Sequence, residues 1–136
     1  QLVSDRVQVW SPTKKKFYFK ETIKEEYNIY SKNFLMYRVL TGDSSDDIPG
    51  IRGAGSKTLM KRLPILFENT KIELEDIFKH VEQANDGTKL SADILASKDM
   101  LKLNHDLMQL DEVDIPGRTK QSILQIVQKP IQKLLK

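Results

Sequence analysis

The sequence predicts a mainly α-helical fold that begins with a small β-hairpin. Apolar residues recur at helical spacing through most of the chain, as in the series Leu74, Ile77, Phe78 and Val81. Runs rich in β-forming residues are confined to the start of the chain. With 136 residues, 39% of them hydrophobic and 30% charged, the chain has the size and composition of one globular domain with a modest core.

The β-hairpin is expected from two short runs, residues 6–10 (RVQVW) and 15–19 (KKFYF), joined by the turn residues SPTK. Lysines 14–16 lie at or beside this turn, where a charged tip reaches water or a partner. Trp10 and Tyr18 could stack on nucleic-acid bases, but packing within the hairpin or core explains them more simply.

Two short helices are expected next, at residues 22–29 and 31–42. Ser31 is placed to act as the N-cap of the second helix, and Gly42 lies near its C-terminus. Helical spacing predicts that its core face contains Phe34, Leu35 and Val39, and the stem of Arg38 could lie on the same face.

Helical patterns also fill the rest of the chain. Ser56 can cap a helix within residues 56–69 that Pro64 stops or kinks. The other expected elements are a helix at 72–86, a loop at 85–89, a helix at 91–110 capped by Ser91, a break at 111–117 and a final helix at 118–136 that Pro130 interrupts.

Composition excludes several classes of protein. The chain has no cysteine, which rules out disulfides and thiolate zinc sites, and no apolar run approaches the roughly 20 residues of a membrane span. No signal-peptide pattern is present, so the composition fits an intracellular protein. The net charge of +3 is compatible with nucleic-acid binding but too small to argue for it. His80 and His105 lack metal-ligand spacing, and we interpret both as structural or surface residues.

The segment GDSSDDIPGIRGAGSKT, residues 42–58, combines acids that suit cations with glycines that suit phosphates. It does not match a calcium-binding EF-hand, because Ile48 and Ala54 stand where glycine and an acid are needed. A P-loop is excluded because Ser56 intrudes before Lys57, and a dinucleotide-binding turn because Thr58 replaces its last glycine.

A helix-hairpin-helix, or helix–three-turn–helix, at about residues 31–64 fits this segment best. Gly53 and Gly55 let the chain bend between two helices and leave backbone N–H groups open to a phosphate, and we expect φ > 0 at Gly55. The helix that starts near Ser56 and the charge of Lys57 favour the same anion. Carbonyl groups on the other side of the turn could hold a monovalent cation. The alternative is a glycine-rich corner without a ligand.

The acids of the segment suggest a metal. Asp43 and Asp46 are three residues apart at a helix end and can direct their carboxylates to one place. Hard oxygen ligands of this kind suit Mg²⁺ or Mn²⁺. Two such ions can activate a water and stabilise the leaving oxygen in phosphodiester cleavage. The alternative is that both aspartates form Asx turns or caps.

The stretch LTGDSSDDIPGIRGAGSKT resembles the signature of the 5′ nuclease superfamily, which is roughly L-x-G-D-x-S-D-N-I-P-G-V-x-G-I-G-x-K-T. This superfamily includes flap endonucleases, phage 5′–3′ exonucleases and the 5′-nuclease domain of bacterial DNA polymerase I. The opening QLVSDRVQVWSPTKKKFYF is similar to the family segment that follows an Asp-containing strand of the catalytic domain. The resemblance covers residues 1 to about 65. The matching residues are Leu40, Gly42, Asp43, Ser45, Asp46, Ile48, Pro49, Gly50, Gly53, Gly55, Lys57 and Thr58.

This resemblance implies a division of the chain. Residues 1–21 would be the C-terminal edge of an α/β nuclease domain, and residues 22–136 a helical DNA-binding domain. Asp43 and Asp46 would hold Mg²⁺ or Mn²⁺ in a two-metal site shared with acids upstream. The DNA-binding set would be Gly53, Gly55, Ser56, Lys57 and Thr58, with Asp47, Arg52 and Lys61 as further candidates and K⁺ at the hairpin.

The function implied is that of a metal-dependent 5′–3′ exonuclease or flap endonuclease, a monomer acting on duplex DNA with a 5′ end or flap in replication and repair. Because the sequence lacks an initiator Met, we expect a piece of a longer protein that hydrolyses DNA negligibly by itself. Two departures from the family are Asp47, where Asn is usual, and Ala54, where Ile is usual. The alternatives are a non-catalytic helix-hairpin-helix module and a protein-interaction domain.

Overall fold

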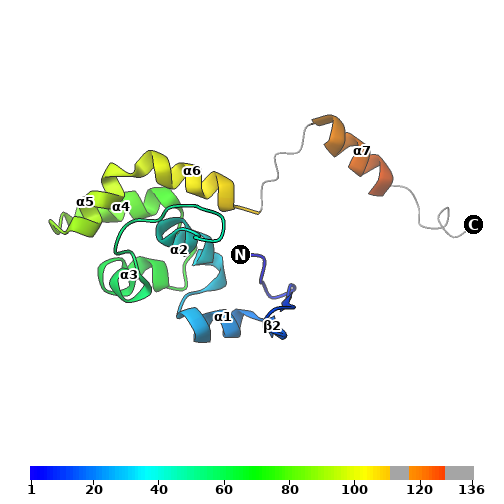
Figure 1. Ribbon diagram of the computed structural model, residues 1–136, viewed down its shortest axis with the longest axis horizontal. Helices are drawn as coiled ribbons and strands as arrows, with labels where there is room; N and C mark the ends of the chain where they lie inside the picture. Colours follow the sequence, from blue (N-terminus) through cyan, green and yellow to red (C-terminus); the bar gives the residue numbers. More distant parts are fainter. Residues whose placement is uncertain (111–116, 128–136) are drawn as a thin grey trace, which may run out of the picture.

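A short antiparallel hairpin is followed by packed helices in this computed structural model, which describes residues 1–110 and 117–127 (Figure 1). The mainly helical fold with a small β element is therefore confirmed. The elements are β1 (Val9–Ser11), β2 (Lys16–Tyr18), α1 (Lys20–Tyr27), the 3₁₀ turn η1 (Ser31–Asn33), α2 (Phe34–Thr41), α3 (Ser56–Arg62), the 3₁₀ turn η2 (Pro64–Phe67), α4 (Leu74–Ala84), α5 (Lys89–Ala96), α6 (Lys98–Met108) and α7 (Gly117–Val127).

The hairpin forms where it is expected, with shorter strands. Trp10 pairs with Phe17, and their rings lie 4.8 Å apart between centroids, which confirms packing within the hairpin. Tyr18 packs against the core from the other face. Lys14 and Lys16 both bind Glu26 of α1, at 3.0 and 2.7 Å. Two of the three hairpin lysines therefore attach the hairpin to α1.

One apolar core joins helices α2 to α6. The predicted core face of α4 is confirmed, because Leu74, Ile77, Phe78 and Val81 are all buried. In α2, Val39 is buried as expected, whereas Phe34 and Leu35 are only half-buried. Met36 and Leu40 complete the buried face of that helix. Among the described residues, no helix is long and apolar enough to cross a membrane.

Three predicted N-caps are wrong, those at Ser31, Ser56 and Ser91. Ser31 opens the 3₁₀ turn η1, so that Asn33 directly precedes α2. Ser56 is the first residue of α3, and Gly55 occupies the N-cap position without a side-chain bond. Pro64 does end α3, as predicted, and begins η2. The local sequence favours serine as the cap, but the preceding turns place the N-cap of α2 two residues after Ser31 and that of α3 one residue before Ser56.

The helix predicted at residues 91–110 is two helices, α5 and α6. They meet at Ser97, whose φ of −108° and ψ of 22° leave the helical region and let the chain change direction. The N-cap of α5 is Thr88 and not Ser91, because the Thr88 side chain accepts a hydrogen bond from the Ser91 backbone N–H. Apolar periodicity continues across this break and cannot show it. Residues 111–116 and Pro130 of the last predictions lie outside the described residues.

Asn33 fixes the connection between η2 and α4. Its side chain is fully buried and donates from Nδ2 to the carbonyl oxygens of Leu66, Glu68 and Thr70, at 3.1, 3.1 and 2.8 Å. Its Oδ1 accepts from the Ile72 N–H at 3.0 Å. A buried amide that satisfies several backbone groups holds an irregular segment in place where no helix or strand can do so.

Candidate metal and nucleic-acid site

The candidate site lies between α2 and α3 and has two parts, the acid loop (residues 43–49) and the basic segment (residues 50–62). The acid loop begins after Gly42 and ends before Gly50, where the two legs touch backbone to backbone. A Cβ at Gly42 would lie 2.8 Å from the Pro49 carbonyl carbon, and one at Gly50 would lie 2.6 Å from Gly42 N. Gly42 also has a φ of +76°. Both positions therefore require glycine.

Backbone hydrogen bonds close the acid loop. Asp43 N–H donates to Ile48 O at 2.8 Å, and Ile48 N–H donates to Asp43 O at 2.9 Å. Just after the loop, Ile51 N–H donates to Leu40 O in the last turn of α2, at 2.8 Å. Asn104 of α6 adds a side-chain contact to Pro49 O at 2.7 Å. The loop is thus a closed turn set on the end of α2.

Asp43 is already held by neighbouring groups. Its Oδ1 accepts from the hydroxyl and the N–H of Ser45, at 2.6 and 3.0 Å, and its Oδ2 pairs with Arg38 of α2. The Ser45 hydrogen bond and the Arg38 guanidinium lower the pKa of Asp43 to about 2. The carboxylate is therefore ionised at neutral pH. It forms the Asx turn that was the alternative to metal binding, and this turn leaves it charged.

Asp46 and Asp47 are exposed on the same loop. Asp47 adopts a φ of +54°, which Asp and Asn tolerate better than most residues. Across residues 1–110 and 117–127, no group of three or more acidic or histidine side chains is arranged to hold a metal ion. Asp43 and Asp46 offer hard oxygen ligands on one loop, so they fit part of a Mg²⁺ or Mn²⁺ site but do not complete one.

The hairpin turn of the basic segment is anchored by two small apolar contacts. Ile51 and Ala54 are buried, while Arg52 and Gly53 between them are exposed. The positive φ expected at Gly55 is instead found at Gly53, with a value of +82°. Gly55 has a φ of −73°, and a Cβ there would meet nothing within 4 Å. The fold therefore requires glycine at 53 but not at 55.

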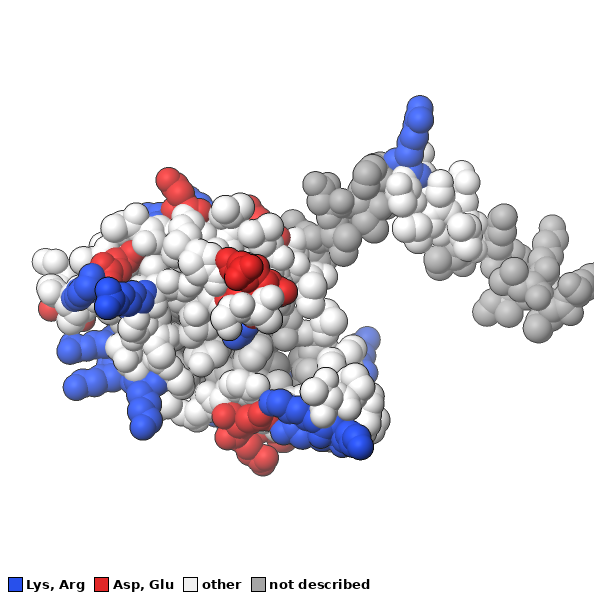
Figure 2. Space-filling model, in the orientation of Figure 1, with Lys and Arg blue, Asp and Glu red and all other residues white. Residues whose placement is uncertain are grey.

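Helix α3 presents a charged face to water. Leu59 is fully buried and fixes the helix to the core, whereas Lys57, Thr58 and Lys61 are exposed and Ser56 is half-buried. Figure 2 shows Lys and Arg side chains projecting from the edge of the molecule beneath α3. The exposed residues of α3 therefore include two lysines that the sequence predicts as candidates for DNA binding, Lys57 and Lys61.

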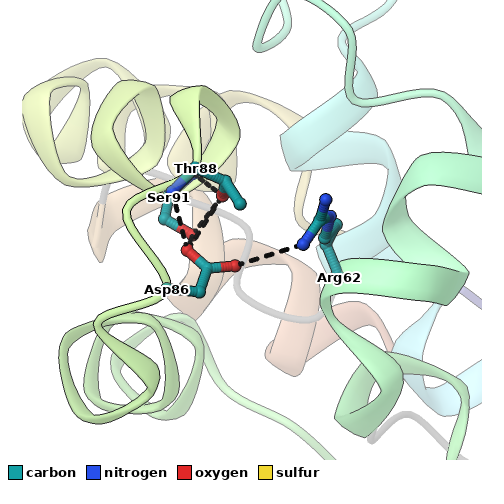
Figure 3. A network of polar contacts seen from close by, with 4 residues as sticks. All are labelled: Arg62, Asp86, Thr88 and Ser91. Atoms are coloured by element: carbon teal, nitrogen blue, oxygen red, sulfur yellow. Dashed lines mark hydrogen bonds and ion pairs between the residues drawn. The ribbon is translucent and has the colours of Figure 1, made fainter.

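One basic residue of α3 has a different environment (Figure 3). Arg62 lies 3.9 Å from Asp86, in the connection between α4 and α5. Asp86 accepts hydrogen bonds from Thr88 N–H, the Thr88 hydroxyl and the Ser91 hydroxyl, at 3.0, 2.9 and 2.7 Å. These bonds, that from Thr88 N–H above all, lower the pKa of Asp86. Arg62 thus links α3 to the next helices.

The remaining cations of the basic segment have no acidic partner among the residues that the structure describes. The ion pairs within the described part of the chain do not include Arg52, Lys57 or Lys61. Sequence reasoning assigned the stem of Arg38 to the core face and missed its ion pair with Asp43, five residues later. It also missed Asn104, because no local signal relates this residue to the loop.

Comparison with known proteins identifies the class of this fold. Residues 29–130, well over half of the chain, match the family model described as "5'-3' exonuclease, C-terminal SAM fold". The chain belongs to this family. The resemblance found in residues 40–58 is confirmed, and the mainly helical architecture agrees with it.

Individual relatives have nuclease or polymerase names. The chain is 31% identical over 124 residues to the thermostable DNA polymerase I of Thermus thermophilus, covering 86% of this chain and 15% of that protein. It is 28% identical over 116 residues to flap endonuclease Xni of Shewanella piezotolerans, covering 85% and 42%. It is 37% identical over 83 residues to a 5'-3' exonuclease of Buchnera aphidicola, covering 61% and 27%. The chain therefore spans less than half the length of each.

Proposed function

We propose that this chain is the C-terminal, DNA-binding part of a metal-dependent 5′–3′ exonuclease or flap endonuclease. The observation that carries the proposal is the order of side chains along one connection. A closed loop that carries three aspartates is followed at once by a turn and helix in which Arg52, Lys57 and Lys61 have no acidic partner among the described residues. A metal-bound phosphodiester needs both kinds of contact. The names of the relatives support the same function, although the chain covers only part of each.

In this proposal Asp43 and Asp46 supply part of a site for two Mg²⁺ or Mn²⁺ ions, completed by acids outside this chain. When bound, the ions activate a water and stabilise the leaving oxygen of the phosphodiester. Asp43 is kept ionised and oriented by Ser45 and Arg38. Arg38 neutralises this carboxylate in the same way that a metal would, so binding of a metal at Oδ2 requires Arg38 to move.

The basic segment would bind the backbone of duplex DNA near its 5′ end or flap. Gly53 and Gly55 leave the backbone accessible, and Ser56, Lys57 and Thr58 begin a helix whose N–H groups favour a phosphate. Arg52 and Lys61 add charge on the same segment. Carbonyl groups of the turn would hold K⁺. Contacts of this kind bind DNA without reading its sequence.

Residues 1–21 would be the edge of the nuclease domain, and the whole protein would act as a monomer. Trp10, Phe17 and Phe19 are about half exposed on the hairpin, as expected of a surface that another part of the protein covers. The family match begins only at residue 29, after this hairpin.

The test uses the longer protein that carries this chain, with a 5′-labelled flap duplex and Mg²⁺. Asp46→Ala is the informative variant, because the Asp46 side chain makes no hydrogen bond or ion pair among the described residues. We expect cleavage to fall at least a hundredfold and duplex binding to stay within about twofold. Equal loss of cleavage and binding would instead favour the rival function, a non-catalytic helix-hairpin-helix module. The isolated chain should show negligible cleavage.

A further inference from the structure

The acid loop has little hydrophobic attachment to the rest of the fold. Within residues 43–49, Asp43 and Ile48 are half-buried and all others are exposed. The hydrogen bonds between Asp43 and Ile48 close the loop but do not hold it against another element. Ligands act well only when neighbouring groups fix their orientation. The loop therefore needs an attachment that is not apolar.

Asn104 provides such an attachment. It lies on α6 with 2% of its surface exposed, and its Nδ2 donates to Val39 O at 3.2 Å and to Pro49 O at 2.7 Å. Val39 precedes the acid loop and Pro49 is its last residue. The amide carries two hydrogens, one for each carbonyl. The side chain thus joins both legs of the loop to α6.

The Val39 carbonyl accepts this bond because α2 ends there. In a continuing helix Val39 O would accept from Asp43 N–H, but that group donates to Ile48 O. Leu40 O, the next carbonyl, accepts from Ile51 N–H on the returning leg. Each of these two helix-end carbonyls is satisfied by a group that also fixes the loop. Removing Asn104 takes this donor from the Val39 carbonyl, where the hydrogen bond is buried, and from the Pro49 carbonyl, where it is partly buried.

We propose that Asn104 is the positioning residue of the acid loop. By tying its two legs to α6, Asn104 sets the place from which Asp43 and Asp46 reach a metal ion. This inference rests on the proposed function, in which these aspartates are ligands. The site is therefore supported by α6, whose Asn104 lies 55 residues after Pro49 in the sequence.

Asn33 offers a matched control, because it is also a buried asparagine that binds backbone carbonyls, but those of the connection between η2 and α4. Asn104→Leu and Asn33→Leu both keep the branching at Cγ, add the same volume and remove the amide. In the 136-residue chain, NMR would measure amide hydrogen exchange and the Mn²⁺ concentration that broadens the loop signals. For Asn104→Leu we expect the amide exchange rates of Asp43 and Ile48 to rise about tenfold more than those of core amides. The Mn²⁺ concentration that broadens the loop signals should be about tenfold higher than in the wild-type chain.

Asn33→Leu should lower the melting temperature. It should leave the ratio of loop exchange to core exchange, and the Mn²⁺ concentration that broadens the loop signals, at their wild-type values. The inference is wrong if loop exchange in Asn104→Leu rises only as much as core exchange, or if Asn33→Leu has the same loop effect. If Asn104→Leu does not fold, Asn104→Ser, which keeps one donor, takes its place. If that variant also fails, slow exchange of the Asn104 Nδ2 hydrogens in the wild-type chain supports the inference and fast exchange overturns it.

The metal measurement separates this inference from the proposed function. A wild-type chain whose Asp43 and Asp46 signals are untouched by Mn²⁺ would overturn the role of these aspartates as ligands. The exchange data would still decide whether Asn104 holds the loop. If Asn104→Leu selectively loses exchange protection in the loop and its loop signals are broadened less by Mn²⁺, the result supports both the positioning role of Asn104 and the role of the aspartates as ligands.

Discussion

The acid loop and the basic segment follow each other in the chain but are held in opposite ways. The acid loop has no buried side chain and is fixed by polar contacts to Ser45, Arg38 and Asn104. The basic segment is fixed by apolar anchors, with Ile51, Ala54, Leu59 and Leu63 all buried. In the first part Asp43 is held by an ion pair with Arg38 of α2, although Asp46 and Asp47 are exposed, whereas in the second only Arg62 has an acidic partner among the described residues.

Under the function proposed above, this difference would suit two kinds of ligand. A metal ion demands that its ligands stay within tenths of an ångström of a fixed geometry, so a loop that carries them gains from polar contacts to the carboxylate itself. A DNA phosphate accepts a long, flexible cation in many positions, so it is enough to anchor the helix and leave the lysines in water. The two parts therefore respond differently to mutation.

The largest difference is expected from alanine at glycines of the two parts. Gly50→Ala forces a Cβ into the Thr41 carbonyl and Gly42 N, so we expect a loss of about 3–5 kcal/mol in the free energy of unfolding. Gly55→Ala meets no atom and has an ordinary φ, so its effect should stay within about 1 kcal/mol. Urea unfolding measures both, and similar losses would mean that the legs of the loop are not in contact.

Acid should weaken the acid loop through Asp43. Because the pKa of Asp43 in the fold is about 2, below its ordinary value of 3.8, the unfolded chain takes up the proton first. The stabilisation is present above pH 3.8 and is lost as the pH falls toward 2. Asp43→Asn should therefore lower the melting temperature at pH 7 and have a smaller effect at pH 2.5.

Glu26 titrates in the same range and must be separated from Asp43. Hydrogen bonds from Lys16 and Lys14 lower the pKa of Glu26 to about 2. Glu26→Gln should also matter less in acid, but it should leave amide exchange at Asp43 and Ile48 unchanged at pH 7. If the effect of Asp43→Asn is the same at both pH values, its ion pair with Arg38 does not contribute to stability.

Much of the basic segment could be predicted from the sequence, because its determinants are local. Pro64 ends α3 through its own backbone, and the spacing of glycines predicts a turn before Ser56. The sequence did not show which glycine takes the positive φ, and Gly53 does so because Ile51 and Ala54 on either side are both buried. The period of apolar residues likewise predicted the core face of α4.

The acid loop was less predictable because distant residues hold it. Its acids are evident in the sequence, and Asp43 was recognised both as a ligand and as a turn former. Asn104 comes from a helix whose break at Ser97 the periodicity did not reveal, and its partners are backbone carbonyls that have no sequence signal. Arg62 has the same charge as Lys57, and only the structure shows that Asp86 distinguishes them.

This last distinction leads to the smallest predicted effect. If the basic segment binds three or four phosphates, the slope of log affinity against log salt should be near −3, from about 0.9 counterions per contact. Lys57→Ala should reduce the size of that slope by about one and weaken binding to all duplexes alike.

Arg62→Ala removes the same charge from the same helix, but the Arg62 guanidinium is directed to Asp86. The slope should therefore stay at the wild-type value while stability falls. Lys102→Ala, on α6, should leave the slope unchanged, and its highly exposed pair with Glu75 should contribute little to stability. The measurement is fluorescence anisotropy of a labelled duplex at several salt concentrations. If Lys57→Ala keeps the wild-type slope, Lys57 does not touch a phosphate; if Arg62→Ala changes it equally, the helix binds DNA by its total charge and not by the face that the structure leaves free.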